Sequence, residues 1–338
     1  MSQSSAGYKA VAKLYNALMT GVVLTLVSQR GNAPARDFVR AHFRRQHLEK
    51  FLPGLTKLGL DGLPDAVACA QYHYLSNALG GVKTEYVKES DAKAWVRYPP
   101  PRWIWQGTAI CGVPTEVNAA MLHGWHGHNG VSLNNPRLGF VCTGLTTDGD
   151  PGLEGYYFDY GHPIAEHERV RYAKDERMPR FDPSQAPRLD VASWPEERLA
   201  KVERAYAVEY LRSLVPTLTD LFGEQEMVAI LGRTARLIGM QFYDDMAAIL
   251  GIRERTAQAF IWLTAALLQA SGESVQAHGS ELRQSGWKAM DGIAGVPASA
   301  LAAWNELLVG MLSVHDRFLT LSVEDRRDRD GAIVWRVG

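Results

Sequence analysis

The sequence predicts an α+β fold made of two related units, each a helical part followed by a strand, a helix and a β-hairpin, packed as a pseudo-dimer. Stretches with helical apolar spacing alternate along the chain with short strand-like stretches. Several motifs also recur in the same order in both halves. The chain has 338 residues, of which 46% are hydrophobic and 22% charged, so it is long enough for two domains with their own cores.

The repeat rests on four pairs of matched segments. In each half, Gly-Val-Pro precedes an alanine-containing helix, and an Asp-Gly turn follows that helix. Before the Gly-Val-Pro motif, each half also has a leucine-rich segment that contains one proline, and then a tryptophan. The matched pairs are residues 47–58 with 210–221, Trp95 with Trp287, residues 111–114 with 294–297, and residues 148–149 with 330–331.

Helix and strand signals give the order of elements. Glycines after apolar runs mark helix ends, and prolines mark helix starts or strand ends. We expect helices over 34–51, 63–79, 114–128, 195–222, 224–250, 256–270 and 297–314, strands over 83–98, 138–146, 153–160 and 280–290, and a hairpin over 317–337.

A charged, proline-containing stretch separates the two halves and is typical of an inter-domain linker. The resulting division is an N-terminal helix over 1–34, a first unit over 35–165, a linker over 166–194 and a second unit over 195–338. Residues 17–27 are apolar but too short to span a membrane. They predict a packed helix, with a signal sequence as the alternative.

The composition of the chain indicates its cellular compartment and the kinds of partner it can bind. The net charge is -1, without the excess of basic residues that nucleic-acid binding needs. We therefore expect no nucleic-acid partner, and we also expect no membrane partner. Three cysteines, an odd number, favour a reducing compartment, so we expect a cytoplasmic protein, with a homodimer left open. The sequence contains no Gly-rich phosphate loop, no G-x-S-x-G and no H-E-x-x-H.

The densest chemistry is the segment His123-Gly-Trp-His126-Gly-His128. On a helix His123 and His126 share a face, and His128 lies near the frayed end. Three imidazoles can hold a catalytic zinc, or iron with a carboxylate. Without a metal, one histidine can act as a general base. The alternative is a polar helix end, where the helix dipole favours histidine.

Three further sets of side chains extend this site. Cys142 is a candidate nucleophile with His123 as its base, although burial as an inert thiol is the usual fate of cysteine. Arg233 and Arg236 lie one helical turn apart and can hold a substrate carboxylate, or form a solvated face. Aromatic side chains around the histidines predict a pocket for a flat molecule, or a packed core. Those we expect to contact substrate are Trp103, Trp125 and Tyr157.

Each unit resembles the family named after L-2-amino-thiazoline-4-carboxylate hydrolase. Short motifs carry the resemblance: Leu221-Phe-Gly-Glu, Leu231-Gly-Arg and Ile238-Gly in the second unit, and Asn134-Asn-Pro-Arg-Leu-Gly-Phe-Val-Cys-Thr and Gly149-Asp-Pro in the first. The family pattern continues with cysteine where this chain has Gly152 and Leu153. The resemblance implies hydrolysis of a C–N bond in a small heterocycle.

Together these observations predict a small-molecule enzyme, a hydrolase or lyase. It would act by hydrolysis or addition–elimination on a small, anionic, cyclic substrate. The alternative is a sensor that binds a small molecule or metal without catalysis. A third option is a structural protein with dispersed surface histidines. If the histidines lie within reactive distance of a carboxylate or a thiol, the enzyme is favoured over the sensor and the structural protein.

Overall fold

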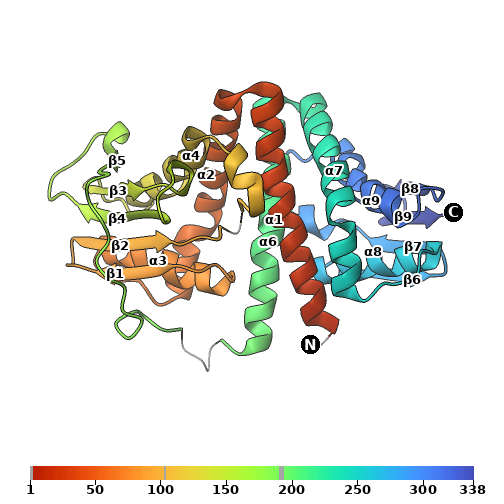
Figure 1. The fold of residues 1–338 in the computed structure, drawn as a ribbon, viewed down its shortest axis with the longest axis horizontal. Coiled ribbons are helices and arrows are strands. Elements are labelled where there is room, and N and C mark those ends of the chain that lie inside the picture. Colours follow the sequence, from red (N-terminus) through yellow and green to blue (C-terminus); the bar gives the residue numbers. More distant parts are fainter. Residues whose placement is uncertain (1–2, 103, 190–193) are drawn as a thin grey trace. The chain divides into compact units, whose positions relative to one another are not determined.

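The computed structural model describes residues 3–102, 104–189 and 194–338, and it confirms the α+β class. The chain forms two compact units (Figure 1). The N-terminal unit is Leu26–Leu199, and the C-terminal unit combines Met1–Thr25 with Ala200–Gly338. The predicted N-terminal helix therefore does not stand alone, because most of it belongs to the C-terminal unit.

The N-terminal unit combines three longer helices with a five-stranded sheet of order β1-β2-β4-β3-β5; α3 packs on β1, β2 and β4, and α2 packs on α3 and α4. All pairs are antiparallel except β3 with β5, which is parallel. Its elements are α2 (Asn32–Lys57), α3 (Asp65–Leu79), β1 (Glu85–Lys88), β2 (Lys93–Tyr98), η1 (Gly107–Gly112), α4 (Thr115–Gly124), η2 (His126–His128), α5 (Asn129–Ser132), β3 (Leu138–Gly144), η3 (Thr146–Asp148), β4 (Leu153–Asp159), η4 (Glu166–Glu168) and β5 (Val170–Tyr172).

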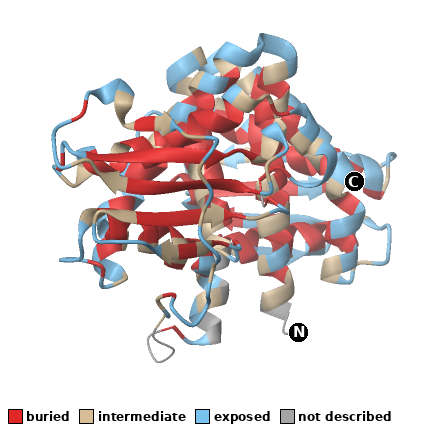
Figure 2. Cartoon of the chain, turned by 60° about the vertical axis from the view of Figure 1, so that its left-hand side comes forward, coloured by how far each residue is buried: buried red, intermediate tan, exposed pale blue. Residues whose placement is uncertain are grey.

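Both faces of this sheet are covered, and its central strands are buried (Figure 2). Alternation along each strand separates the side chains into two sets. On the inner face, Tyr98, Phe140 and Tyr157 contact imidazoles that come from the helical side. On the outer face, Trp95 and Tyr156 are register partners and form a small cluster with their neighbours.

The C-terminal unit has a four-stranded antiparallel sheet of order β6-β7-β9-β8. Residues 3–25 of α1 pack on α7 and α8, where Lys13 pairs with Asp245 and Tyr15 bonds Ser271. The elements are α1 (Gln3–Arg30), α6 (Glu196–Phe222), α7 (Glu224–Leu250), α8 (Ala257–Ser271), β6 (Val275–His278), β7 (Glu281–Ser285), η5 (Lys288–Met290), α9 (Ser299–His315), β8 (Leu321–Arg326) and β9 (Ala332–Val337).

The two units share one order of elements: two helices, a hairpin, a helix and a second hairpin, with matching strand order. The Gly-Val-Pro segments precede α4 and α9, and the Asp-Gly turns join β3 to β4 and β8 to β9, as the repeat predicts. The match of residues 47–58 with 210–221 is wrong by one helix. It pairs α2 with α6, whereas the order of elements makes α7 the counterpart of α2.

Four predicted elements differ from the structure. The predicted strand 83–98 is the hairpin β1–β2, and the predicted strand 280–290 contains β7 followed by η5, with β6 before it unpredicted. The helix predicted to reach His128 ends at Gly124. The predicted linker contains β5, which joins the sheet beside β3. Short β5 escapes sequence analysis because its pairing is parallel and depends on contacts distant in sequence.

One helix among the described residues, Ser5–Arg30, is long and apolar enough to cross a membrane, and 61% of its most apolar window is buried. Core helices and signal sequences share these properties.

Helices α7 and α9 pack closely against each other. An added Cβ at Gly310 would lie 2.1 Å from the Arg236 carbonyl oxygen, so glycine is needed at this crossing.

Candidate functional site

The break after α4 turns the histidine segment into the core of the N-terminal unit. Gly124 allows α4 to approach α2, because an added Cβ would lie 2.6 Å from the Arg40 carbonyl oxygen. Arg44 then caps the end of α4 by donating to the carbonyl oxygens of Gly124 and His123, at 2.8 and 2.9 Å. Beyond this end the backbone changes direction into η2. The side chains of His126 and His128 therefore do not follow the helical spacing on which their prediction rested.

His126 lies at the end of a buried hydrogen-bond chain. The Asn129 amide donates to the Tyr157 hydroxyl oxygen at 3.0 Å, and the Tyr157 hydroxyl lies 2.7 Å from His126 Nδ1. Of the two groups that bond the Tyr157 hydroxyl, the Asn129 NH2 can only donate, so His126 Nδ1 is the partner that can accept the hydroxyl proton. The neutral imidazole of His126 then carries its own proton on Nε2, so this ring presents a donor on its far side.

A second buried imidazole, His73 from α3, stacks on His126 with ring centroids 4.2 Å apart and an interplanar angle of 12°. Its Nδ1 bonds the Tyr98 hydroxyl at 2.9 Å. His73 is only 5% exposed, and its Nε2 has no hydrogen-bond partner among the described residues. Most buried polar atoms in proteins are paired, so this ring edge points to a missing partner.

Aromatic side chains surround this pair. The Trp125 ring meets His73 edge to face at 5.9 Å and His47 at 5.4 Å. His47 stacks on Phe51 at 4.7 Å and bonds Ser132 through Nε2. Within the described part of the chain, Trp125 Nε1, His47 Nδ1 and Asn129 Oδ1 join His73 Nε2 as buried polar atoms without a hydrogen-bond partner. We call His47, His73, Trp125, His126 and Asn129 the histidine–aromatic cluster.

Burial keeps these imidazoles neutral. Burial, then nearby His128, His73 and Arg44, lowers the pKa of His47 to about 3. Burial, then His47 and Arg102, lowers the pKa of His126 to about 3. Burial and neighbouring His126 hold the pKa of His73 well below its usual range. Among the described residues, the charged neighbours that shift these pKa values are Arg44, beside His47, and Arg102, beside His126, so the electrostatic field at the cluster is positive.

The three histidines predicted to bind zinc or iron are not brought together. His123 Nε2 bonds the Tyr172 hydroxyl at 3.3 Å, His126 bonds Tyr157, and His128 packs edge to face on His47 at 5.2 Å. In residues 3–102, 104–189 and 194–338, no group of three or more His, Cys, Asp or Glu side chains is arranged to hold a metal ion. The predicted donor set does not fit a metal in this arrangement, and metal binding stays a prediction.

The predicted nucleophile Cys142 lies on β3, beside its register partner Tyr172 on β5. It is fully buried, and its thiol donates weakly to the Gly144 carbonyl oxygen. Burial raises the pKa of Cys142 to about 12, so the thiol is protonated at neutral pH. His123 contacts the neighbouring Tyr172 hydroxyl, and the catalytic role of the thiol stays a prediction.

The remaining predicted substrate contacts divide between the two units. Trp125 and Tyr157 belong to the histidine–aromatic cluster or bond it directly. Trp103 lies outside the described residues. Arg233 and Arg236 lie on α7 in the C-terminal unit, and Arg236 forms an ion pair with Glu306. The alternative from the sequence was a solvated face with ion pairs inside one helix, whereas this ion pair joins α7 to α9.

Sequence reasoning missed the partners that complete the cluster: His47, His73, Tyr98 and Asn129. One signal was available, because His73 lies among apolar residues on the buried side of α3. A polar side chain at a core position of an amphipathic helix needs a partner. The C-terminal unit contains a buried histidine whose two ring nitrogens both have hydrogen-bond partners. There His315 bonds Tyr243 through Nδ1 and the Thr256 carbonyl oxygen through Nε2.

No protein-family model, curated protein or solved structure matches this chain. The resemblance to the thiazoline-carboxylate hydrolase family therefore stays a prediction, and function has to be argued from the geometry of the cluster.

Proposed function

We propose that the N-terminal unit binds a small planar organic molecule with an anionic, hydrogen-bond-accepting group at the histidine–aromatic cluster. The observation that carries this proposal is His73 Nε2, a buried polar atom without a partner beside a stacked imidazole and an indole. An unsatisfied buried polar group costs about 1–3 kcal/mol. A ligand that supplies its partner recovers that cost.

The chemistry of the surroundings defines the ligand class. His126 Nε2–H and Trp125 Nε1–H are donors. The positive field disfavours a cation and favours a carboxylate or a carbonyl. Aromatic rings stack on planar groups with a contribution of about 0.5–1.5 kcal/mol beyond burial. A cytoplasmic protein with a small-molecule ligand and no nucleic-acid partner, as the sequence predicts, is compatible with this site.

The test is a matched ligand series of benzoate, benzamide and benzylamine, with nicotinate as a heteroaromatic acid. Thermal unfolding of the full chain is followed with each compound, and calorimetry gives the affinity of any compound that raises the Tm. We expect the carboxylates to raise the Tm and the amine to have no effect. A free ligand at 100 times its Kd stabilises by about 2.7 kcal/mol.

Two variants of the histidine–aromatic cluster and one control variant test whether the ligand binds at this cluster. His73→Leu and Trp125→Leu should abolish the shift, whereas His167→Ala, at an exposed position in η4, should leave it unchanged. A shift that survives in both cluster variants would place the ligand elsewhere. No shift with either acid would remove the anionic ligand class.

A second candidate function, hydrolysis or addition–elimination, is favoured by the environment of His123. Its imidazole bonds a tyrosine hydroxyl, and burial followed by nearby Arg40 lowers its pKa. A neutral imidazole can accept a proton from water as that water attacks a ring carbon or carbonyl. The probe is L-2-amino-thiazoline-4-carboxylate, the compound that the resemblance implies. Addition of one water, detected by mass spectrometry, should depend on His123 and not on exposed His167.

A further inference from the structure

After β5 the chain makes a turn at residues 174–175 and then crosses the outer face of the N-terminal sheet without regular secondary structure (Figures 1 and 2). We call residues 173–182 the strap. The Ala173 amide donates to the Cys142 carbonyl oxygen at 2.9 Å and so extends the β3–β5 ladder by one bond. Glu176 and Met178 then turn toward the sheet and are half-buried, while Lys174 and Arg177 are exposed. Glu176 and Met178 thus face the sheet at alternate positions, as in a bound linear segment, and Arg177 between them donates to the Thr143 carbonyl oxygen of β3 at 3.3 Å.

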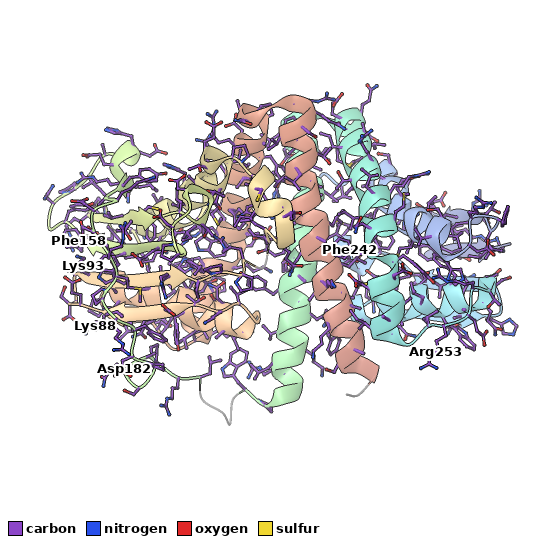
Figure 3. The ribbon with its side chains drawn as sticks, in the orientation of Figure 1. Lys88, Lys93, Phe158, Asp182, Phe242 and Arg253 are labelled. Carbon is purple, nitrogen blue, oxygen red and sulfur yellow. The ribbon has the colours of Figure 1, made fainter. Side chains whose placement is uncertain are left out.

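Glu176 fits a site that recognises one carboxylate with two different groups. The Tyr156 hydroxyl donates to Oε1 at 2.8 Å, and Lys93 Nζ lies 3.4 Å from Oε2. Lys93 is held in place by cation–π contacts, with Nζ 4.2 Å from the Tyr156 ring centroid and 4.8 Å from that of Trp95. Figure 3 labels Lys93 beside Phe158, its register partner, and Asp182 at the end of the strap.

Met178 is bound through both its side chain and its backbone. The side chain packs against Trp95, Val141 and Tyr156. Its amide donates to Glu154 Oε1 at 3.0 Å, and the Thr143 hydroxyl donates to the same oxygen at 2.8 Å. Glu154 is only 7% exposed. A buried carboxylate that accepts a main-chain amide fixes the register of an extended segment.

The C-terminal unit shows that this kind of sheet does not need such a cover. The exposed side chains of its β7 alternate with buried Leu282 and Gln284. They take part in ion pairs of Arg283 with Asp330 and of Glu281 with Arg336. The aromatic outer face is thus a particular property of the N-terminal unit.

We propose that the outer face of the N-terminal sheet is a binding surface for an acidic linear segment of the type Glu-x-Met, which the strap occupies in cis. Lys93 and the Tyr156 hydroxyl select the glutamate, and the surface around Trp95 selects the methionine. A partner protein that presents an extended segment of this chemistry competes with the strap. The strap has the advantage of a covalent tether, which corresponds to an effective concentration in the millimolar range.

The test uses a labelled synthetic peptide with the sequence of residues 170–182 and the full chain carrying Glu176→Ala and Met178→Ala, which weakens the strap. We expect saturable binding of the peptide, followed by fluorescence anisotropy. Wild-type protein should bind it at least tenfold more weakly because the intact strap competes. Lys93→Met added to the weakened chain should reduce binding at least tenfold. A peptide with glutamine in place of the residue-176 glutamate should show the same loss.

Hydrogen exchange of residues 170–182 in the same samples completes the test. The weakened chain should exchange faster in this segment than wild type. Failure of the peptide to bind at 1 mM while the strap exchanges fast would overturn the binding surface. An unchanged exchange rate in the weakened chain would also overturn the proposal, because other contacts would then hold the strap. Equal binding with and without Lys93 would remove the selection for glutamate.

Discussion

Mild acid is expected to destabilise the N-terminal unit selectively. Burial and nearby Arg45 lower the pKa of His42 to about 3, and burial likewise lowers the pKa values of His47 and His126 to about 3. In the unfolded chain each of these histidines titrates near 6.5. The unfolded state therefore binds more protons than the folded state between pH 6.5 and pH 3. The stabilisation is complete above pH 6.5 and is lost as the pH falls below that value.

The size of this effect follows from the two pKa values. Between pH 7 and pH 5, each of the three histidines removes about 2 kcal/mol from the free energy of unfolding, or about 6 kcal/mol together. That sum is comparable to the whole stability of a typical domain, about 5–15 kcal/mol. Asp148 and Asp159 of this unit contribute little in this window, because their hydrogen bonds to Lys174 and Arg137 hold their pKa values below the ordinary 3.8.

Hydrogen exchange with peptide-level readout measures the effect in each unit of one molecule, after correction for the pH dependence of intrinsic exchange. We expect protection in α2 and α3 to fall by roughly four orders of magnitude between pH 7 and pH 5, or to vanish. Protection in α7 and α9 should change less, since burial lowers the pKa of His315 there while its bond to the Thr256 carbonyl oxygen opposes that shift. His42→Leu removes one titrating group and should reduce the difference by about a third. Equal losses in both units, or none in α2, would refute the reasoning.

Four other predictions concern single contacts. Gly310→Ala should cost about 3 kcal/mol in urea unfolding, since its Cβ would meet the α7 backbone, whereas Gly232→Ala has ordinary space and should be neutral. Tyr157→Phe should cost about 1–3 kcal/mol, because two buried groups lose their partner, and calorimetry measures it. Glu273→Ala should cost about 2–4 kcal/mol in urea, because it leaves two backbone amides without an acceptor. Elemental mass spectrometry should find no stoichiometric zinc or iron in wild type or His126→Ala, since no three His, Cys, Asp or Glu side chains among the described residues are arranged to hold a metal ion.

Local signals predicted much of the fold. The bounds of α7 match because Gly223 and Gly251 flank an apolar helical run, and both adopt positive φ. β3 and β4 match because an Asp-Gly-Asp-Pro turn separates two apolar runs. Contacts between distant segments decided the rest. Arg44 from α2 ends α4, and β5 exists only through its pairing with β3.

The candidate site shows the same division. Sequence identified His126, Trp125 and Tyr157, because unusual residues gather in that stretch. It could not identify His73 as the stacking partner of His126, since the two rings meet only when α3 and η2 pack on one sheet. It also placed three histidines on one helix. The helix ends before two of them, and that end depends on a glycine that permits close approach of α2.

The C-terminal unit is assembled from two separate pieces of chain, and this has a consequence for biosynthesis. Residues 3–25 pack against α7 and α8, which lie more than 200 residues later in the sequence. At about 5–20 residues per second, a ribosome needs roughly 10–50 s to complete those partners. During that interval the apolar N-terminal helix has no completed binding site, while the whole N-terminal unit can emerge and fold. Nascent chains stalled before residue 224 should therefore engage holding chaperones through this helix, and release should follow synthesis of α8.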